Sequence, residues 1–166
     1  MESSISIDYP LHLDASAIER FIPHRKPMRF AETVTVLAHN HYQGTAIFSA
    51  NSFVLQGHFP GHPIVPGVMI IEAGAQIAAA GLRAGDPRAR DAAIGRLGVL
   101  LAIRKCFFRL PVLPEQRLDY ELQCRQLSDS AVNICGQVHS RGILVATLEF
   151  AFGQIEADRL PHGSQA

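Results

Sequence analysis

Two ionisable residues that lie near each other in the sequence could together perform acid–base chemistry. His58 lies in a loop rich in glycine and proline, and Glu72 follows in a stretch that is otherwise apolar. An imidazole titrates near neutral pH and can act as a general base. Apolar surroundings disfavour a charged carboxylate, so we expect Glu72 to favour its neutral form and act as a general acid. The pair predicts that His58 removes a proton and Glu72 donates one.

Each of these residues also has a purely structural interpretation. A single histidine in a turn often only shapes the loop, and Glu72 could be a buried carboxylate held by Gln76, one helical turn later. A second histidine, His62, precedes a proline and is interpreted as shaping the loop or facing solvent. Because His58 and His62 have no third ligand at a recognisable spacing, we expect no metal site.

The segment between the two candidates should supply a third group. Pro66 suits the first position of a helix, where its missing N–H costs nothing. The N–H of Gly67 should then lack a partner within the helix, and the helix dipole favours negative charge at this end. A thioester carbonyl placed at Gly67 would be polarised as it becomes enolate-like. Base, acid and oxyanion donor together predict proton abstraction next to a carbonyl, with loss of a leaving group.

The pattern of apolar residues predicts one helix inside an antiparallel sheet. Residues 67–82 are apolar on nearly every side, so this helix must be covered by other elements. Apolar and polar residues alternate in segments expected as strands with hairpin-length connections, which are 34–38, 42–48, 118–124, 132–138 and 144–152. A further strand run covers 98–108, and Ser16 and Glu19 form a capping box before a short helix at 17–22. This α+β arrangement leaves the helix incompletely covered, so we expect a partner subunit.

Composition limits the class of protein. The chain has 166 residues, 48% hydrophobic and 18% charged, and we expect one folded domain over 1–153 with a polar, flexible tail over 154–166. Its 15 Lys and Arg residues balance 15 Asp and Glu residues, which argues against a broad nucleic-acid interface. The apolar stretch 65–82 carries Glu72 and Gln76, so it is expected as a core helix and not as a membrane span.

The N terminus and the cysteines are typical of a cytoplasmic protein. Residues 1–5 have neither the basic nor the apolar region of a secretory signal. Cys106, Cys124 and Cys135 are odd in number and form no CxxC motif. We therefore expect free thiols in the core of a protein from a reducing compartment.

With these motifs the chain resembles the FabZ-type 3-hydroxyacyl-[acyl-carrier-protein] dehydratases of fatty-acid synthesis, from about residue 18 to residue 152. The strongest part is the sequence GHFPGHP at 57–63, followed by PGV at 66–68, IEA at 71–73 and AQ at 75–76. A second match is PHR at 23–25 with Pro27, and a third comprises Lys105, Phe108, PV at 111–112 and Pro114. Three motifs in the right order make the resemblance specific.

The resemblance implies a hotdog fold, in which a curved antiparallel sheet wraps around one long central helix. Such proteins are homodimers, often assembled as trimers of dimers, and the catalytic histidine and acid come from different subunits. These roles fall on His58 and Glu72, and the neighbouring motif residues Phe59, Gly67, Val68 and Gln76 are the expected substrate-binding residues. No metal or redox cofactor is implied, because the phosphopantetheine arm arrives with the acyl carrier protein. The related FabA-type isomerising dehydratases have aspartate at the position of Glu72, so dehydration without isomerisation is favoured.

Several residues depart from the family's pattern, namely Lys26, Arg29, Gly74, Val99 and Leu100 and the pair Glu115 and Gln116. These departures leave the length and shape of the substrate's acyl chain open. A role in a polyketide or polyene pathway is therefore as compatible with the sequence as a role in fatty-acid synthesis. A thioesterase on the same fold is an alternative, because a carboxylate and a histidine could activate water. A non-catalytic module that binds acyl thioesters is another, although the retained His58 and Glu72 argue against it.

The acyl carrier protein should dock on a local basic patch, because such carriers are generally acidic. Lys105 and Arg109 share strand parity if the strand is regular, and we expect them to receive the carrier. The alternative is that these charges protect a solvated strand edge. If docking lies elsewhere, Arg25, Arg29 and Arg96 are the other candidates.

Overall fold

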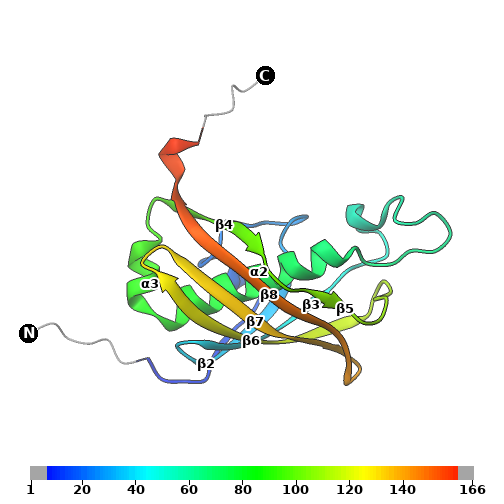
Figure 1. Ribbon diagram of the computed structural model, residues 1–166, viewed down its shortest axis with the longest axis horizontal. Helices are drawn as coiled ribbons and strands as arrows, with labels where there is room; N and C mark the ends of the chain where they lie inside the picture. Colours follow the sequence, from blue (N-terminus) through cyan, green and yellow to red (C-terminus); the bar gives the residue numbers. More distant parts are fainter. Residues whose placement is uncertain (1–6, 161–166) are drawn as a thin grey trace, which may run out of the picture.

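The computed structural model describes residues 7–160, which form one antiparallel sheet around a long helix (Figure 1). The strands are β1 (Leu11–Leu13), β2 (Ala31–Ala38), β3 (His41–Ile47), β4 (Arg96–Ile103), β5 (Phe107–Phe108), β6 (Arg117–Ser128), β7 (Ala131–Ser140) and β8 (Ile143–Glu156). They pair in the order β1-β2-β3-β6-β7-β8-β4, and β5 pairs with β8. The helices are α1 (Ala15–Ile18), α2 (Gly67–Gly85) and α3 (Pro87–Ala92), with short 3-10 turns at Phe53–Leu55 and Ala157–Arg159.

Helix α2 lies in the curve of the sheet and packs against β2, β3 and β6 (Figure 1). Two glycines make this close approach possible. A Cβ atom on Gly81 would lie 2.6 Å from the ring of Tyr42, and one on Gly44 would lie 2.6 Å from the side chain of Ile77. Both distances are too short for any larger residue. The prediction of a curved sheet around one central helix is confirmed.

The strand segments predicted from alternation are confirmed, but the end of β8 and the run 98–108 differ from the prediction. Strand β8 continues to Glu156, which pairs with Arg96, so ordered structure extends past the domain end expected at 153. Residues 161–166 of the expected tail lie outside the described residues. The run 98–108 is two strands and not one, because β4 ends at Ile103 and β5 begins at Phe107.

The short helices differ from the sequence prediction. Helix α1 begins at Ala15 because the carboxylate of Asp14 accepts the N–H of Ala17 at 2.7 Å. The expected cap, Ser16, instead donates its hydroxyl to Asp14. Helix α3 was not expected; Asp86 caps it by accepting the N–H of Arg88 at 2.9 Å. In both cases an aspartate at the N-cap, and not a capping box, sets the start of the helix.

The three cysteines are free, as predicted, but they are not all in the core. Cys135 is exposed on β7, which contradicts the expectation of three core thiols. Cys124 is partly buried, and this burial raises the pKa of its thiol to about 11. Among residues 7–160, no helix has both the length and the apolar character that a membrane span requires.

The two edges of the sheet differ in length and character. Strand β1 has three residues, whereas β4 has eight and, within residues 7–160, pairs only with β8. Strand β4 carries the exposed apolar residues Leu100, Leu101 and Ile103. A long apolar edge with unpaired backbone groups is a surface on which another strand can pair.

Candidate active site

The loop that carries His58 is held by its own backbone. Gly57 and Gly61 adopt φ values of 85° and 77°, in the left-handed region that favours glycine. The N–H of His58 donates to the carbonyl of Leu55 at 3.2 Å, and the N–H of Ile64 donates to the carbonyl of His58 at 3.1 Å. These bonds fix the backbone on both sides of the imidazole.

The imidazole of His58 has a defined orientation. Its Nδ1 lies 3.0 Å from the carbonyl oxygen of Ile64. A carbonyl only accepts, so Nδ1 carries the hydrogen and Nε2 is left with a free lone pair. The ring of Phe59 stacks on the imidazole, with 4.3 Å between the ring centroids. His62, by contrast, is exposed, which agrees with its interpretation as a residue facing solvent.

His58 shares an open hollow with the N-terminus of α2. The hollow is also lined by Gly67, Ile70, Phe108 and Arg109. A Cβ atom on Gly67 would lie 2.8 Å from the ring of Phe108, so only glycine fits there. In the described part of the chain, the N–H of Gly67 has no hydrogen-bond acceptor. It is therefore available to an oxygen placed near His58.

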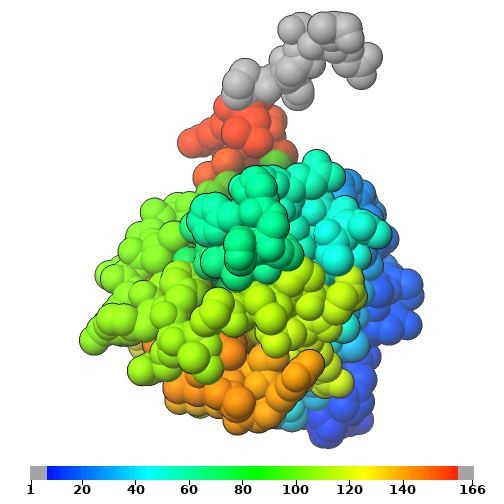
Figure 2. Space-filling view, turned by 90° about the vertical axis from the view of Figure 1, so that its right-hand side faces the viewer, coloured from blue at the N-terminus to red at the C-terminus, as the bar shows by residue number. Residues whose placement is uncertain are grey.

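The rim of this hollow is exposed and apolar. Phe59 is 54% exposed and Val68 is 62% exposed, and Phe108 also faces solvent. Figure 2 looks onto this end of the molecule, where the loop before α2 stands out beside the segment that follows β4. Apolar side chains gathered on one rim are typical of a surface that another molecule covers.

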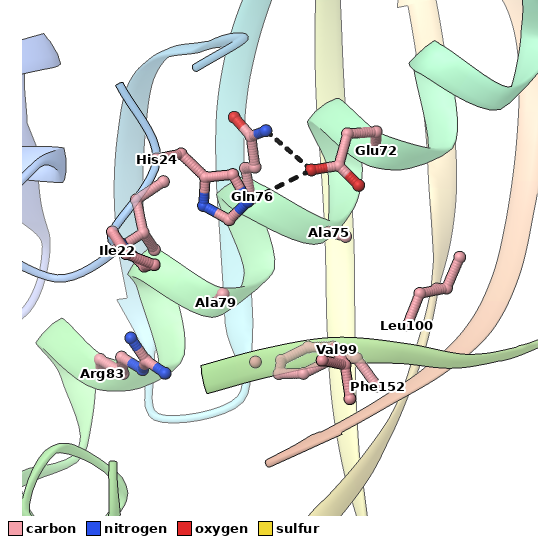
Figure 3. A pocket seen from close by; sticks show the side chains of 12 residues that line it. Ile22, His24, Glu72, Ala75, Gln76, Ala79, Arg83, Val99, Leu100 and Phe152 are labelled. Carbon is pink, nitrogen blue, oxygen red and sulfur yellow. Dashed lines mark hydrogen bonds and ion pairs between the residues drawn. The ribbon is translucent and has the colours of Figure 1, made fainter. Parts of the chain in front are cut away.

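Glu72 lies in a separate pocket, and its surroundings are not entirely apolar (Figure 3). Its Oε1 accepts a hydrogen bond from Nε2 of Gln76 at 2.8 Å, and Nε2 of His24 lies 3.5 Å from the same oxygen. The side chain is 28% exposed. The expectation of a carboxyl group among apolar neighbours alone is therefore wrong, because contacts distant in sequence bring polar groups to it.

Gln76 is the residue that holds the carboxyl group of Glu72. It is 1% exposed, and its amide is fixed at both ends. Its oxygen accepts the N–H groups of Phe30 and Ala31 at 2.8 and 3.3 Å, and its nitrogen donates to the carbonyl of Met28 at 2.8 Å as well as to Glu72. The sequence analysis considered that Gln76 could hold the carboxylate of Glu72, and this hydrogen bond is present. It leaves Oε2 of Glu72 without a partner among the described residues.

His24 is a site residue that the sequence reasoning did not assign. Its Nδ1 is buried without a hydrogen-bond partner in the described residues, while its Nε2 faces Glu72. Burial lowers the pKa of His24, the negative charge of Glu72 opposes this shift, and the positive charges of Arg83 and Arg25 add to it. The PHR motif at 23–25 was the available signal, but nothing in local spacing linked it to Glu72.

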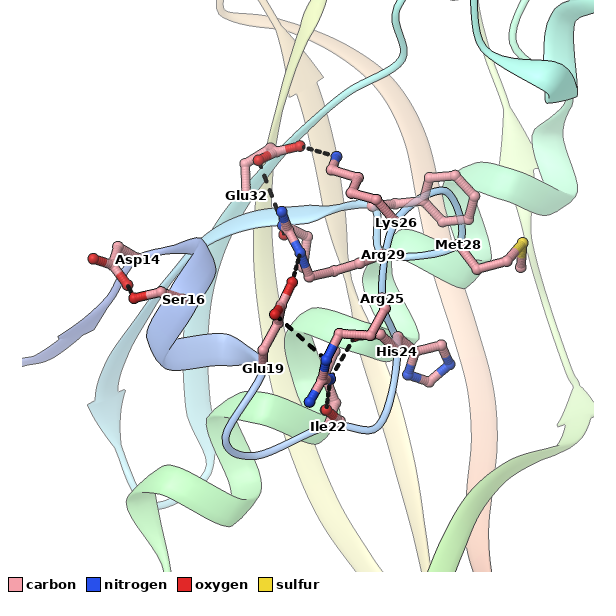
Figure 4. A network of polar contacts seen from close by, with 12 residues as sticks. Asp14, Ser16, Glu19, Ile22, His24, Arg25, Lys26, Met28, Arg29 and Glu32 are labelled. Atoms are coloured by element: carbon pink, nitrogen blue, oxygen red, sulfur yellow. Dashed lines mark hydrogen bonds and ion pairs between the residues drawn. The ribbon is translucent and has the colours of Figure 1, made fainter.

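A polar network anchors the segment that carries His24 (Figure 4). Arg29 is 6% exposed, and its guanidinium donates to Glu19 at 3.0 Å and to the carbonyl of Ala31. Glu32 lies 3.5 Å from Arg29 and accepts from Lys26 at 2.6 Å. The two carboxylates explain how an arginine can be buried where the family pattern has an apolar residue.

Within one chain, the candidate base and the candidate acid lie beside different faces of α2. At about 100° per residue, Glu72 and Ile70, which lines the hollow of His58, point about 160° apart around the helix. The cavity that contains Glu72 has a volume of about 70 Å³. Its lining residues are Ile22, Pro23, His24, Glu72, Ala75, Gln76, Ala79, Arg83, Gly98, Val99, Leu100 and Phe152, and His58 is not among them. A single chain therefore holds two half-sites.

The expected docking residues Lys105 and Arg109 are exposed, but the argument from strand parity is wrong. The N–H groups of Arg104 and Lys105 both donate to the carbonyl of Glu149 on β8, which interrupts the regular pairing with β8 between the end of β4 and the start of β5. Lys105 lies over the ring of Phe107, with 5.7 Å to the centroid, and Arg109 lines the hollow of His58. The two residues flank β5, whose Phe108 also lines this hollow.

Comparison with known proteins gives relatives over most of the chain. The model of the FabA-like domain matches residues 22–147. The 3-hydroxyacyl-[acyl-carrier-protein] dehydratase FabZ of Aliarcobacter butzleri is 32% identical over 139 residues, covering 83% of this chain and 95% of the relative. FabZ of Nitratiruptor sp. is 35% identical over 145 residues, covering 82% and 94%.

Solved structures of other proteins have folds similar to that of this chain. The dehydratase heterocomplex ApeI:P from Xenorhabdus doucetiae matches with a TM-score of 0.66 and 25% identity, over 83% of this chain and 90% of the other. A hypothetical thioesterase from Streptococcus pneumoniae matches with a TM-score of 0.52 and 12% identity, over 85% and 93%. At 12% identity the thioesterase likeness shows the fold alone.

Proposed function

Since the chain belongs to the family of the FabA-like domain, we propose that it dehydrates 3-hydroxyacyl thioesters carried by acyl carrier protein to the trans-2-enoyl thioesters. The observation that carries this proposal is the pair of half-sites on α2. One presents an oriented imidazole beside a free helix N–H, and the other presents a carboxyl group held by Gln76. These are the groups that removal of water next to a thioester requires.

The reaction assigns one step to each group. Nε2 of His58 takes a proton from C2, and the N–H of Gly67 stabilises the enolate-like thioester oxygen. Glu72 gives its proton to the C3 hydroxyl group, the C3–O bond breaks, and water leaves. The electron pair of the C2–H bond becomes the C2–C3 double bond. Exchange with solvent then returns the proton from His58 to Glu72.

We further propose that the complete site forms between two copies of this chain. The two half-sites lie beside different faces of α2, and the exposed apolar side chains of Phe59 and Val68 lie near His58. The free edge of β4 offers a place for the same strand of a second copy to pair. A dimer of this kind supports the approach of His58 from one copy to Glu72 of the other.

The substrate arrives on an acyl carrier protein, and we place the docking site of this carrier beside the hollow of His58. Lys105 and Arg109 are exposed there, and the stretch between β4 and β5 is open to solvent. Positive charges on this rim would attract an acidic carrier and steer its phosphopantetheine arm toward His58. The arm brings its own thioester, and the proposed steps use no metal or redox group.

Mass spectrometry of carrier-bound 3-hydroxyacyl substrates tests the activity directly. Incubation with the protein should lower the mass of the loaded carrier by one water molecule. Release of the free hydroxy acid, with the carrier left unloaded, would instead indicate a thioesterase. An unchanged mass across acyl chains of several lengths would contradict both activities and leave a binding module.

A further inference from the structure

The pocket of Glu72 has a second charged residue at its other end. Glu72, Ala75, Ala79 and Arg83 follow one another on one face of α2 and all line the cavity. With a rise of about 1.5 Å per residue, the Cα atoms of Glu72 and Arg83 are about 16 Å apart along the helix axis. Figure 3 shows Glu72 and Arg83 at opposite ends, with the alanines between them.

The guanidinium of Arg83 is partly buried and is not neutralised. Its Nη1 donates to the carbonyl of Phe21 at 2.7 Å. A Cβ atom on Gly98 would lie 3.8 Å from Nη2, so the other side of the group faces the start of β4. Within residues 7–160, no carboxylate lies within 4.0 Å of Arg83, and burial lowers the pKa of its guanidinium.

A second arginine adds to the positive charge at this end. Arg90 donates from Nε to the carbonyl of Arg83 at 3.1 Å, and its guanidinium lies 5.3 Å from the ring centroid of Phe21. The contrast with Arg29 is informative, because that buried arginine faces both Glu19 and Glu32. Even a partly desolvated guanidinium without a counter-ion carries a cost, which a ligand carboxylate would offset.

The walls between the two ends suit an apolar chain. Ala75 and Ala79 leave room along the helix, and Ile22, Val99 and Phe152 face them across the cavity. An acyl chain that reacts at Glu72 and extends along this face would bring its far end toward Arg83. A methyl end would desolvate the guanidinium without compensation, whereas a carboxylate would form a charge-assisted pair with it.

We propose that Arg83 makes this site selective for acyl chains whose far end carries a carboxylate. The proposal rests on the proposed function for the position of the reacting carbons, and it adds the chemical class of the substrate. Its alternative is that Arg83 serves only to satisfy the carbonyl of Phe21 and the C-terminal end of α2.

Binding of unreactive ligands tests Arg83 without requiring turnover. Pantetheine thioethers of several chain lengths, ending either in a carboxylate or in a methyl group, are titrated into the intact protein by calorimetry. At the best length, the wild-type protein should bind the carboxylate ligand at least about tenfold more tightly, as expected for a partly buried charged hydrogen bond. Arg83→Met should lose this preference, and Arg83→Lys should keep part of it.

Matched controls separate the possible causes. Arg125→Met removes an exposed arginine on β6 and should leave the preference unchanged. A thermal melt of each variant shows whether loss of the bond to Phe21 has unfolded the protein, and Arg83→Lys keeps a donor there. Equal preference in wild type and Arg83→Met, or preference for the methyl ligand in the wild type, would overturn the proposal. Failure of the proposed dehydration would appear separately, as no loss of water from any hydroxyacyl substrate.

Discussion

The two half-sites on α2 differ in how completely one chain builds them. Glu72 lies on the central helix α2 and is held by the side-chain amide of Gln76. Three backbone groups, of Met28, Phe30 and Ala31, fix this amide in turn. His58 lies on a loop at the surface, and among the described residues its imidazole has one polar contact, to Ile64. The core positions the proposed acid, whereas a turn with an open side positions the proposed base. In the proposed dimer, the open side of the His58 half is where Glu72 of a second copy would approach.

The largest expected effect comes from removing either half. We expect His58→Ala and Glu72→Gln each to lower the rate of dehydration by about 10²–10⁴-fold, the usual contribution of a general acid or base. Each variant should keep the circular dichroism spectrum and the melting temperature of the wild type, because neither residue belongs to the hydrophobic core. Near wild-type turnover in either variant would remove that residue from the mechanism.

Gln76→Leu should damage the acid half in both structure and activity. The leucine would leave the N–H groups of Phe30 and Ala31 and the carbonyl of Met28 without their partner. Each unsatisfied buried group costs about 1–3 kcal/mol, so the free energy of unfolding should fall by several kcal/mol. Chemical denaturation measures this change. Gln137→Leu, at an exposed position of β7, is the matched control and should be close to neutral.

If Gln76→Leu were as stable as the control, the acid half would not depend on this amide. The Glu72 half would then be no more firmly positioned by the core than the His58 half. A stable variant with low activity would still assign Gln76 to the orientation of Glu72.

His24 should make the acid half sensitive to pH. Burial lowers the pKa of His24 below its ordinary value of about 6.5, so the unfolded chain binds the proton first as the pH falls. The stability contributed by neutral His24 is full above about pH 6.5 and is lost as the pH falls through the lower pKa of the folded state. His24→Asn should lack this loss. Denaturation of both proteins at a series of pH values measures the difference, and parallel curves would contradict the assignment.

The smallest expected effect concerns the carrier and the rim of the open half-site. Lys105→Glu with Arg109→Glu should raise the KM for carrier-bound substrate, more strongly at low salt, because exposed charges act mainly on encounter. Turnover of a small pantetheine-linked substrate should barely change. Lys105→Glu alone is the cleaner variant, since Arg109 also lines the hollow of His58. Equal losses on both substrates would indicate damage to the fold.

The sequence predicted the elements better than it predicted the contacts between them. Period-two alternation identified the long strands, and the continuous apolar stretch identified α2, because both patterns follow from local geometry. The approach of His24 to Glu72 and the hold of Phe30 on Gln76 could not be predicted, because they join segments more than forty residues apart. Arg29 is only ten residues from Glu19, but its burial depends on a contact with this residue at the end of α1 that no local pattern encodes. The break between β4 and β5 arises where two consecutive N–H groups share one carbonyl, which no alternation pattern encodes.

Mixing the two inactive variants tests most directly whether the halves come from different chains. His58→Ala and Glu72→Gln are combined under conditions that allow subunits to exchange, and exchange is confirmed by native mass spectrometry with one variant isotopically labelled. A mixed dimer would contain one site with both residues intact and one with neither, so dehydration should reappear. At equal amounts, with random exchange, it should approach about a quarter of the wild-type rate, because half of the dimers are mixed and each has one of two sites. Confirmed exchange without any recovery of dehydration would contradict a site shared between two copies.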